Sequence, residues 1–482
     1  MKKRWTLLAM VLAALTLLSG CLFRAPDDLY RQPEKSAGYE KLNQAIRTVR
    51  AGLEMEFGAQ VEDAVILSGD NTANIQLQDL DGDGRRESAV TFLRVPGIEK
   101  PIKIYIFSQI GEEYVVTGVV EGEGSAVYAI AYAEISGEGR KELAVNWQIS
   151  NGAYQLGVYT LDEIDLPGAG LGEEETLAAL RAMTRGELMG SERLLTRCSV
   201  AADGSSGCYL LDMDRDTRPE VLVTRMDSNG LSGQVEVFHW EDGALKSAAL
   251  ADLSAGISTL NRIRTNYLAG EYDQPALYVT STLADGNRAI DVVAFVGDSF
   301  TNIALGEEGT SREIIQGFTE INPTDINKDS VAELPAPYQL PSYGESSSSN
   351  FWFIDWAQYD DRGRRNHVLT TYHNVSDGWY LVIPESWRDQ ITISRNDQVT
   401  GQREVVFSHW RGENLEPEPF LSIYRVASSR VAGLEEDGWT VLREEENIAY
   451  AARFREGGWD SGLSELDLLE RFNTIQRSWY SE

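Results

Sequence analysis

The stretch Asp79-Leu80-Asp81-Gly82-Asp83-Gly84-Arg85-Arg86-Glu87 places acidic side chains at positions 1, 3, 5 and 9 of a loop that contains two glycines. Calcium is a hard cation that binds about six to eight oxygens, and carboxylates at this spacing can converge on one point with the backbone carbonyl of position 7. The predicted ligands are Asp79, Asp81, Asp83, Glu87 and the carbonyl of Arg85. We therefore expect a Ca²⁺ site in loop 79–87.

The same spacing recurs twice further along the chain. The predicted ligands in loop 212–220 are Asp212, Asp214, Asp216, Glu220 and the carbonyl of Arg218, and those in loop 325–333 are Asp325, Asn327, Asp329, Glu333 and the carbonyl of Val331. Residues 134–142 form a weakened copy, in which Ser136 and Glu138 replace aspartates, and residues 267–279 form a copy that has lost most of its ligands. A loop that recurs this often marks a structural repeat, and it is therefore stronger evidence for the architecture of the chain than for a catalytic site.

An EF-hand is the rival interpretation of such a loop. It requires a bidentate acid at position 12 and a helix after the loop. Position 12 is Val90, Val223 or Ala336 in the three complete loops, and β-type runs follow them directly. The EF-hand interpretation is therefore rejected.

The repeats predict an all-β chain. The first two loops begin 55 residues apart, at residues 79 and 134, and each repeat holds several short strand patterns. Units of about 50 residues with four strands each are typical of a β-propeller. We expect about six to seven four-stranded blades over residues 59–460, with a helical insertion near 168–190, an N-terminal helix at 39–58 and a C-terminal helix at 461–482.

In these loops the chain resembles the FG-GAP/VCBS propeller repeats, also found in the integrin α-subunit head, whose loops read D-x-D-G-D-G-x-x-D or E. Loop 79–87 matches almost fully, whereas Thr217 and Ser330 stand where glycine is usual. The resemblance covers roughly residues 60–345 and implies blades with calcium in their loops. The rest of the predicted propeller is assigned by the continuity of its strand patterns.

The amino terminus combines a basic start, an apolar stretch over 5–17 and Leu18-Ser19-Gly20-Cys21. The apolar stretch is too short to span a membrane comfortably. This arrangement resembles a bacterial lipoprotein signal, residues 1–20, which implies a lipid on Cys21 and a polar tether over 21–38. Membrane anchoring through Cys21 would place the chain on the extracytoplasmic face of a bacterial membrane.

The net charge excludes one class of partner, and the few cysteines leave one disulfide possible. The formal net charge of −32 repels phosphate backbones, so nucleic-acid binding is excluded as a function. Besides Cys21 the chain has only Cys198 and Cys208, which flank a turn-rich stretch. A hairpin disulfide and a pair of free thiols are both compatible with this spacing.

No catalytic residues are predicted. The four histidines, His239, His367, His373 and His409, lie in no known catalytic or metal-binding motif, and we expect them to be structural. Trp387 lies in a turn-like segment and is the tryptophan that we expect to be most exposed. The predicted function is a non-enzymatic binding or scaffolding module with a protein or glycan partner in the cell envelope. The alternative is a polysaccharide-binding or polysaccharide-active protein on the same fold.

Overall fold

The computed structural model describes residues 37–161, 172–343, 350–396 and 402–480, apart from residues 228, 230, 272, 319, 437, 456 and 458. The predicted signal peptide, Cys21 and most of the predicted tether lie outside these residues. The described chain forms six antiparallel sheets of four or five strands and has few helices, which confirms the all-β prediction and its lower estimate of six blades. No described helix is both long enough and apolar enough to cross a bilayer.

The six sheets follow one another in chain order. The first contains β1 (Glu62–Asp63), β2 (Ile75–Gln78), β3 (Ser88–Arg94), β4 (Ile102–Ile110) and β5 (Glu113–Gly122), and the second β6 (Ala126–Ala133), β7 (Glu142–Ser150), β8 (Ala153–Thr160) and β9 (Ser191–Cys198). The third contains β10 (Cys208–Leu211), β11 (Glu220–Met226), β12 (Gly233–Glu241) and β13 (Ala244–Asp252), and the fourth β14 (Ile257–Leu268), β15 (Gln274–Leu283), β16 (Arg288–Val296), β17 (Ser299–Asn302) and β18 (Ile314–Ile315). The fifth contains β19 (Leu334–Gln339), β20 (Trp352–Tyr359), β21 (Arg365–Asn374), β22 (Trp379–Ile383) and β28 (Phe472–Thr474), and the sixth β23 (Ile391–Asn396), β24 (Arg403–His409), β25 (Glu418–Ala427), β26 (Thr440–Glu444) and β27 (Ile448–Phe454).

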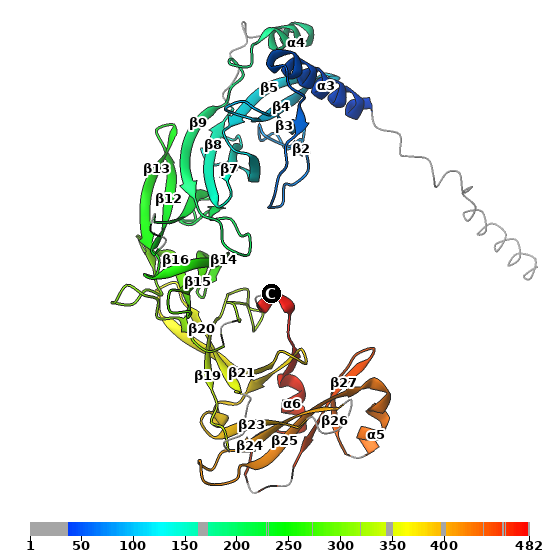
Figure 1. Ribbon diagram of the computed structural model, residues 1–482, viewed down its shortest axis with the longest axis vertical. Helices are drawn as coiled ribbons and strands as arrows, with labels where there is room; N and C mark the ends of the chain where they lie inside the picture. Colours follow the sequence, from blue (N-terminus) through cyan, green and yellow to red (C-terminus); the bar gives the residue numbers. More distant parts are fainter. Residues whose placement is uncertain are drawn as a thin grey trace, which may run out of the picture.

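The sheets are arranged along an arc, with the first and the sixth at its two ends (Figure 1). Five separate apolar clusters join the sheets in consecutive pairs, from the first and second to the fifth and sixth. The described residues form no sixth cluster between the two end sheets. Instead, helix α3 (Ala37–Phe57) packs on the first sheet and α5 (Val431–Glu436) on the sixth, as capping elements do at the ends of repeat proteins.

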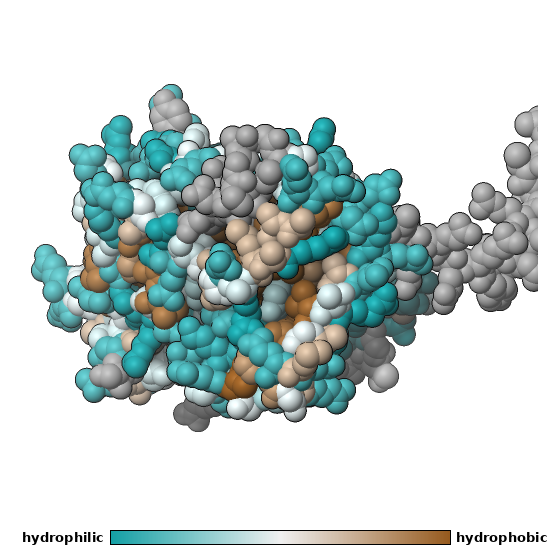
Figure 2. Space-filling view, turned by 90° about the horizontal axis from the view of Figure 1, so that it is seen from above, coloured by the Kyte–Doolittle hydropathy of each residue, from teal (hydrophilic) through white to brown (hydrophobic). Residues whose placement is uncertain are grey.

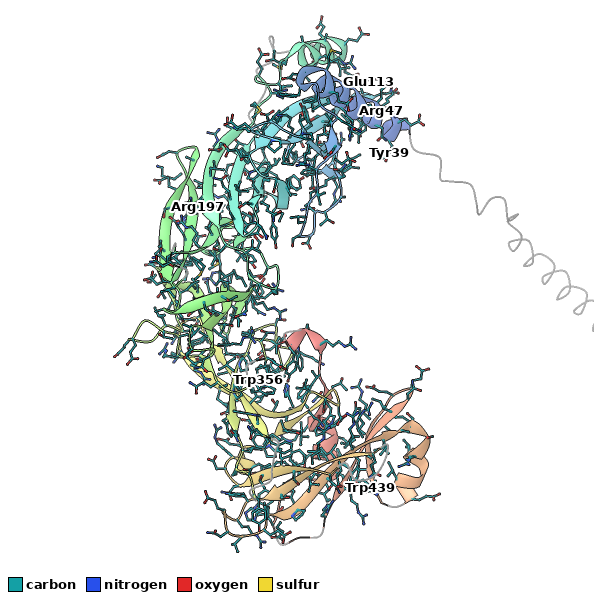
Figure 3. The ribbon with its side chains drawn as sticks, viewed as in Figure 1. Tyr39, Arg47, Glu113, Arg197, Trp356 and Trp439 are labelled. Carbon is teal, nitrogen blue, oxygen red and sulfur yellow. The ribbon has the colours of Figure 1, made fainter. Side chains whose placement is uncertain are left out.

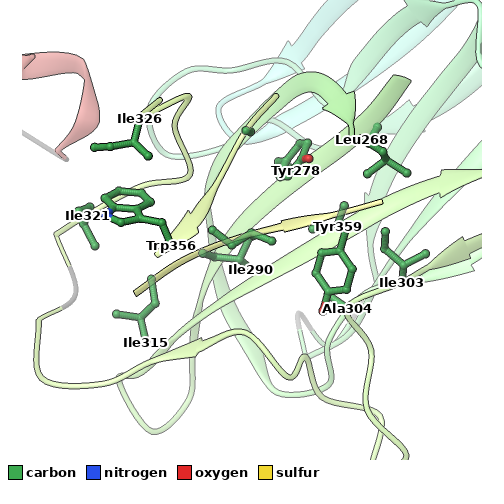
Figure 4. Close-up of a cluster of buried hydrophobic side chains, with 14 of the residues drawn as sticks. Leu268, Tyr278, Ile290, Ile303, Ala304, Ile315, Ile321, Ile326, Trp356 and Tyr359 are labelled. Carbon is green, nitrogen blue, oxygen red and sulfur yellow. The ribbon is translucent and has the colours of Figure 1, made fainter. Parts of the chain in front are cut away.

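The junction between the fourth and fifth sheets shows how consecutive sheets pack (Figure 4). Tyr278 and Ile290 of the fourth sheet lie in one buried cluster with Trp356 and Tyr359 of the fifth. The indole of Trp356 is fully buried and donates to Thr371 Oγ1 at 2.8 Å. Figure 3 labels Trp356 at this junction and Trp439 beside α5, at the end of the arc that the sixth sheet forms. Apolar side chains from facing sheets therefore hold the arc together.

Helix α3 covers most of the predicted helix 39–58, and α4 (Glu173–Ala182) lies in the predicted helical insertion near 168–190, but the described residues of 461–482 do not form the predicted helix. There α6 (Glu465–Arg471) is followed by β28, which pairs with β22 of the fifth sheet, and then by a 3₁₀ helix, Arg477–Trp479. The edge of β22 offers unpaired backbone groups, which a strand satisfies and a helix does not. Leu466 and Leu469, which stand at helical spacing and could have formed an apolar helix face, are 70% and 41% exposed.

The expectation that Trp387 is exposed is also wrong. Its side chain is fully buried, and its indole N–H donates to the carbonyl oxygen of Ser461 at 2.7 Å. The ring packs against Phe407, Phe420 and Trp459. A short 3₁₀ helix, Glu385–Trp387, turns the indole into the core that joins the fifth and sixth sheets. Trp387 is therefore a structural residue.

Cys198 and Cys208 are free thiols in the structure, so the disulfide option is not formed. Cys198 ends β9 of the second sheet and donates its S–H to Asn146 Oδ1 at 3.1 Å, whereas Cys208 begins β10 of the third sheet. Burial raises the pKa of the Cys198 thiol to about 12 and that of Cys208 well above its usual value. Both thiols are therefore chemically quiet at neutral pH.

Candidate metal centres in the repeated loops

The repeated loops share one pattern of backbone hydrogen bonds. The N–H of position 6 donates to the side chain of position 1 in the three complete loops and in loop 134–142. The donors are Gly84, Gly139, Thr217 and Ser330, and the acceptors Asp79, Glu134, Asp212 and Asp325, at 3.1, 2.9, 2.9 and 3.0 Å respectively. In the three complete loops the N–H of position 7 also donates to the position 5 carboxylate, at 2.7 to 2.9 Å. The loop is thus a fixed turn with its acids directed inward.

Left-handed backbone at positions 4 and 6 makes this turn. Glycines occupy these positions in loops 79–87 and 134–142, where a positive φ costs little. In loops 212–220 and 325–333 the same φ values, between 65° and 79°, are adopted by Arg215, Thr217, Lys328 and Ser330. A side chain in this region costs about 1 kcal/mol or more. The surrounding structure therefore imposes the turn even where glycine has been lost.

Carboxylates gather in the three complete loops. Ligand-type oxygens of Asp79, Asp81 and Asp83 lie within 4.8 Å of one another, as do those of Asp212, Asp214 and Asp216 and those of Asp325, Asp329 and Glu333. Asp212 Oδ1 is buried and has no hydrogen-bond partner among the described residues. These oxygen-rich groups could hold a divalent cation. Each contains three of the side chains predicted for its loop, but Glu87, Glu220 and Asn327 lie outside these groups.

The ninth-position glutamates are the most buried acids of these groups. Glu220 is 5% exposed and Glu333 fully buried, and they accept the backbone N–H of Met213 at 2.6 Å and of Ile326 at 2.9 Å. Burial raises the pKa of Glu220 to about 7 and that of Glu333 to about 8. Burial also raises the pKa of Glu87, which is less enclosed. A bound cation would offset the cost of ionising these carboxyls.

Each loop also reaches into the apolar junctions between sheets. Position 2 is buried in the three complete loops and in loop 134–142, and it belongs there to one of the clusters that join consecutive sheets; these residues are Leu80, Ile135, Met213 and Ile326. Neighbouring loops touch as well, since Lys141 N–H donates to the carbonyl of Leu80 at 2.9 Å and Gln274 Nε2 to that of Met213 at 2.8 Å. The conformation of a loop is thereby coupled to the docking of adjacent sheets.

Sequence reasoning missed two side chains of these sites, His239 and Gln358. Each lies on the strand that pairs with the one beginning at or just after the ninth-position glutamate, β12 for His239 and β20 for Gln358. Gln358 Nε2 donates to Asp329 at 2.7 Å and to Glu333 at 2.6 Å. His239 forms a possible metal-holding group with Asp214 and Glu220. Strand register brings these residues to the loops, and no local sequence motif predicts this register.

The other histidines are held by structural contacts. His373 is 8% exposed, packs among aromatic rings that include Trp356 and Trp479, and burial lowers its pKa to about 3. His409 stacks on Trp459. His367 Nε2 lies 3.2 Å from Thr370 Oγ1.

A polar groove lies between the first two sheets, beside loops 79–87 and 134–142. It has a volume of about 750 Å³. Its walls include Asp81, Glu87 and Glu142, with Arg193 and Trp240 from β9 and β12. The guanidinium of Arg193 lies over the indole of Trp240, 5.8 Å from the ring centroid. The surface seen from the end that carries α3 and α4 is mainly hydrophilic, with apolar side chains showing in places (Figure 2).

No family model and no curated protein sequence matches the chain. Among solved structures it is similar to an exo-β-1,3-galactanase from Phanerochaete chrysosporium with β-1,3-galactotriose, at 8% identity and a TM-score of 0.23 over 76% of this chain and 80% of that one. It is also similar to the exotype rhamnogalacturonan lyase YesX, at 10% identity and a TM-score of 0.23 over 72% of each chain. Neither the ligand nor the reaction of these enzymes is transferred to this chain.

Proposed function

We propose that the chain is a binding scaffold whose sheets are locked together by divalent cations, with Ca²⁺ in loops 79–87 and 325–333 and a third ion in loop 212–220. The observation that carries this proposal is the coupling within each loop. Three carboxylates gather in each of these loops, while position 2 is buried in the junction with another sheet. Calcium supplies charge neutralisation there, and the loop acids supply the oxygens.

Thermal unfolding with calcium or with a chelator tests this proposal. Asp81 is an exposed acid of loop 79–87, and Asp81→Asn removes its charge at nearly constant shape. Asp285→Asn is a matched control, because Asp285 accepts the Asn287 N–H in a turn but belongs to none of the metal-type groups. A site at ten times its Kd contributes about 1.4 kcal/mol. Calcium should raise the melting temperature of the wild type and of the control by the same amount. It should raise the melting temperature of Asp81→Asn by less. An equal response of all three proteins would contradict the proposal.

We also propose that the chain is anchored to the extracytoplasmic membrane face through Cys21 and works without catalysis. The lipoprotein-type sequence before Cys21 supports the anchor. An arc of sheets that presents exposed loops supports binding of an envelope partner. Incorporation of a labelled fatty acid, lost in Cys21→Ser, is the expected result for the anchor. A water-soluble, unlabelled wild-type chain would contradict it.

A second candidate function is binding of an envelope glycan in the groove between the first two sheets. The groove offers acids, a guanidinium and an indole face, groups that bind sugar hydroxyls and sugar rings. Trp240→Ala should weaken retention on an envelope polysaccharide at least tenfold. Trp439→Ala is the control, because Trp439 also carries an arginine over its ring, Arg453 at 5.7 Å, but packs beside α5 on the sixth sheet, far from the groove. Equal retention of both variants would exclude this groove.

A further inference from the structure

Besides the all-oxygen group of Asp212, Asp214 and Asp216, loop 212–220 has a second group that includes a nitrogen. One ligand-type atom each from Asp214, Glu220 and His239 lies within 4.8 Å of the other two. His239 comes from β12, where Val221 pairs with Phe238, so Glu220 and His239 stand opposite each other across the ladder. Opposite residues in a ladder project to the same face of the sheet. The histidine is therefore built into the loop site by strand register.

The corresponding position in the other sheets shows what His239 replaces. By the same register, Gln109 stands opposite Glu87, Thr160 opposite Glu142 and Gln358 opposite Glu333. In loop 325–333 the amide of Gln358 bridges Asp329 and Glu333 by hydrogen bonds. A side chain at this position can thus reach the loop carboxylates. His239 alone among these four residues is a nitrogen ligand for metals.

The imidazole of His239 lacks the hydrogen bond that a structural role would provide. Its Nε2 atom is buried and has no hydrogen-bond partner in the described part of the chain. Asp212 Oδ1, in the same loop, is a second buried atom without a partner. A buried polar atom without a partner is destabilising, and coordination to a cation would remove this cost. Asp212 belongs to the neighbouring all-oxygen group, whereas the unpartnered Nε2 atom of His239 indicates that the site around the histidine is completed by a ligand.

We infer that loop 212–220 holds a first-row transition ion of the Zn²⁺ type, ligated by Asp214, Glu220 and His239. Calcium and magnesium prefer oxygen ligands, whereas imidazole with carboxylates suits zinc and its neighbours. Ligand atoms around a tetrahedral zinc ion lie about 3.3 Å apart, so closing the group requires the side chains to move by no more than about 1.5 Å. The three loops then differ in metal, with calcium in the two loops whose ligands are all oxygens.

This inference rests on the proposed function only in treating the loop as an ion site, and Zn²⁺ titration tests it separately. The full chain, stripped of metal by a chelator, is titrated with Zn²⁺ and with Ca²⁺ as wild type, His239→Gln and the control His367→Gln. Glutamine at 239 reproduces the chemistry of Gln358. Wild type and control should bind one Zn²⁺ at least 100-fold more tightly than Ca²⁺ in this loop, and His239→Gln should lose at least tenfold in Zn²⁺ affinity. Calcium stabilisation through the other two loops should be unchanged.

A measurement on the wild type alone covers the case that His239→Gln folds poorly. Among the four histidines, only the imidazole nitrogens of His239 should shift in ¹H–¹⁵N spectra when one equivalent of Zn²⁺ is added. Unchanged Zn²⁺ affinity in His239→Gln, or an unshifted His239 spectrum, would overturn the inference while leaving the calcium response intact. Loss of calcium stabilisation with retained Zn²⁺ binding would instead overturn the proposed function alone.

Discussion

Replacing Glu333 with glutamine should make the metal-free protein more stable and remove one calcium response. The Glu333 carboxylate is fully buried between the N–H of Ile326 and the amide of Gln358. Burial raises its pKa to about 8, so ionisation at alkaline pH is costly without a cation. Glutamine has nearly the same shape, keeps an oxygen for the Ile326 N–H and has no charge to ionise.

The size of the effect follows from the raised pKa of Glu333. Between the ordinary glutamate pKa and about 8, the native chain binds more protons than the unfolded chain, so the free energy of unfolding falls as the pH rises through this window. By pH 8 this amounts to roughly 4 kcal/mol, at about 1.4 kcal/mol for each pH unit. Rearranging the Gln358 hydrogen bonds costs about 1 kcal/mol. Glu333→Gln should therefore stabilise the chelated protein at pH 8 by about 2 to 3 kcal/mol, and by much less at pH 5.

Calcium should close this gap. An ion at about 100 times its Kd contributes about 2.7 kcal/mol, so with a Kd of about 0.1 mM the two proteins should become equally stable near 10 mM calcium. Urea unfolding at pH 8 and pH 5, with chelator and over a calcium series, measures this crossing. Glu307→Gln, an exposed substitution, is the control. A destabilised Glu333→Gln in chelator at pH 8, or a calcium response equal to that of the wild type, would refute the reasoning.

Three further predictions concern the turn, the core and a buried histidine. Ser330→Gly should raise the free energy of unfolding by about 1 kcal/mol, because φ is 71° there, and an unchanged urea midpoint would argue against strain. Trp387→Ala should cost about 3 to 5 kcal/mol through loss of a fully buried indole, and full stability would contradict its place in the core. His373 stays neutral in the folded protein because burial lowers its pKa to about 3, so the wild type should lose about 2 to 3 kcal/mol as the pH falls from 6.5 to 4.5. A variant with His373→Gln should lose less over the same range, and equal losses would show that His373 does not titrate as the structure indicates.

The strands and loop sites could be predicted because their signals are local. Acids at alternate positions, with glycine at the two left-handed positions of loop 79–87, define the turn within nine residues. The same local reasoning found α3 and α4. Prediction from the sequence failed where a residue far away in the sequence decides whether a side chain is buried or a segment forms a strand. The indole of Trp387 is buried by Phe407, Phe420 and Trp459, and β28 is a strand because β22 has a free edge.

Two further features, the pairing of Glu220 with His239 and the open arc, also depend on residues that are far apart in the sequence. Strand register brings His239 to the loop, and a shift by one residue would turn it to the other face of the sheet. The ends of the arc depend on which side chains cover the outer sheets. Helix α3 covers the first sheet and α5 the sixth. The 55-residue repeat does not predict which helix covers which end sheet.

Hydrogen exchange measured with calcium and with a chelator tests the central claim, that loop ions lock neighbouring sheets together. Calcium should slow exchange in loops 79–87 and 325–333 and also in strands of the adjoining sheets that pack on Leu80 and Ile326, because these residues are buried in the junctions. The capped sixth sheet, which contributes no such loop among the described residues, should change little. Slowing confined to the loops, or no slowing at all, would contradict the account.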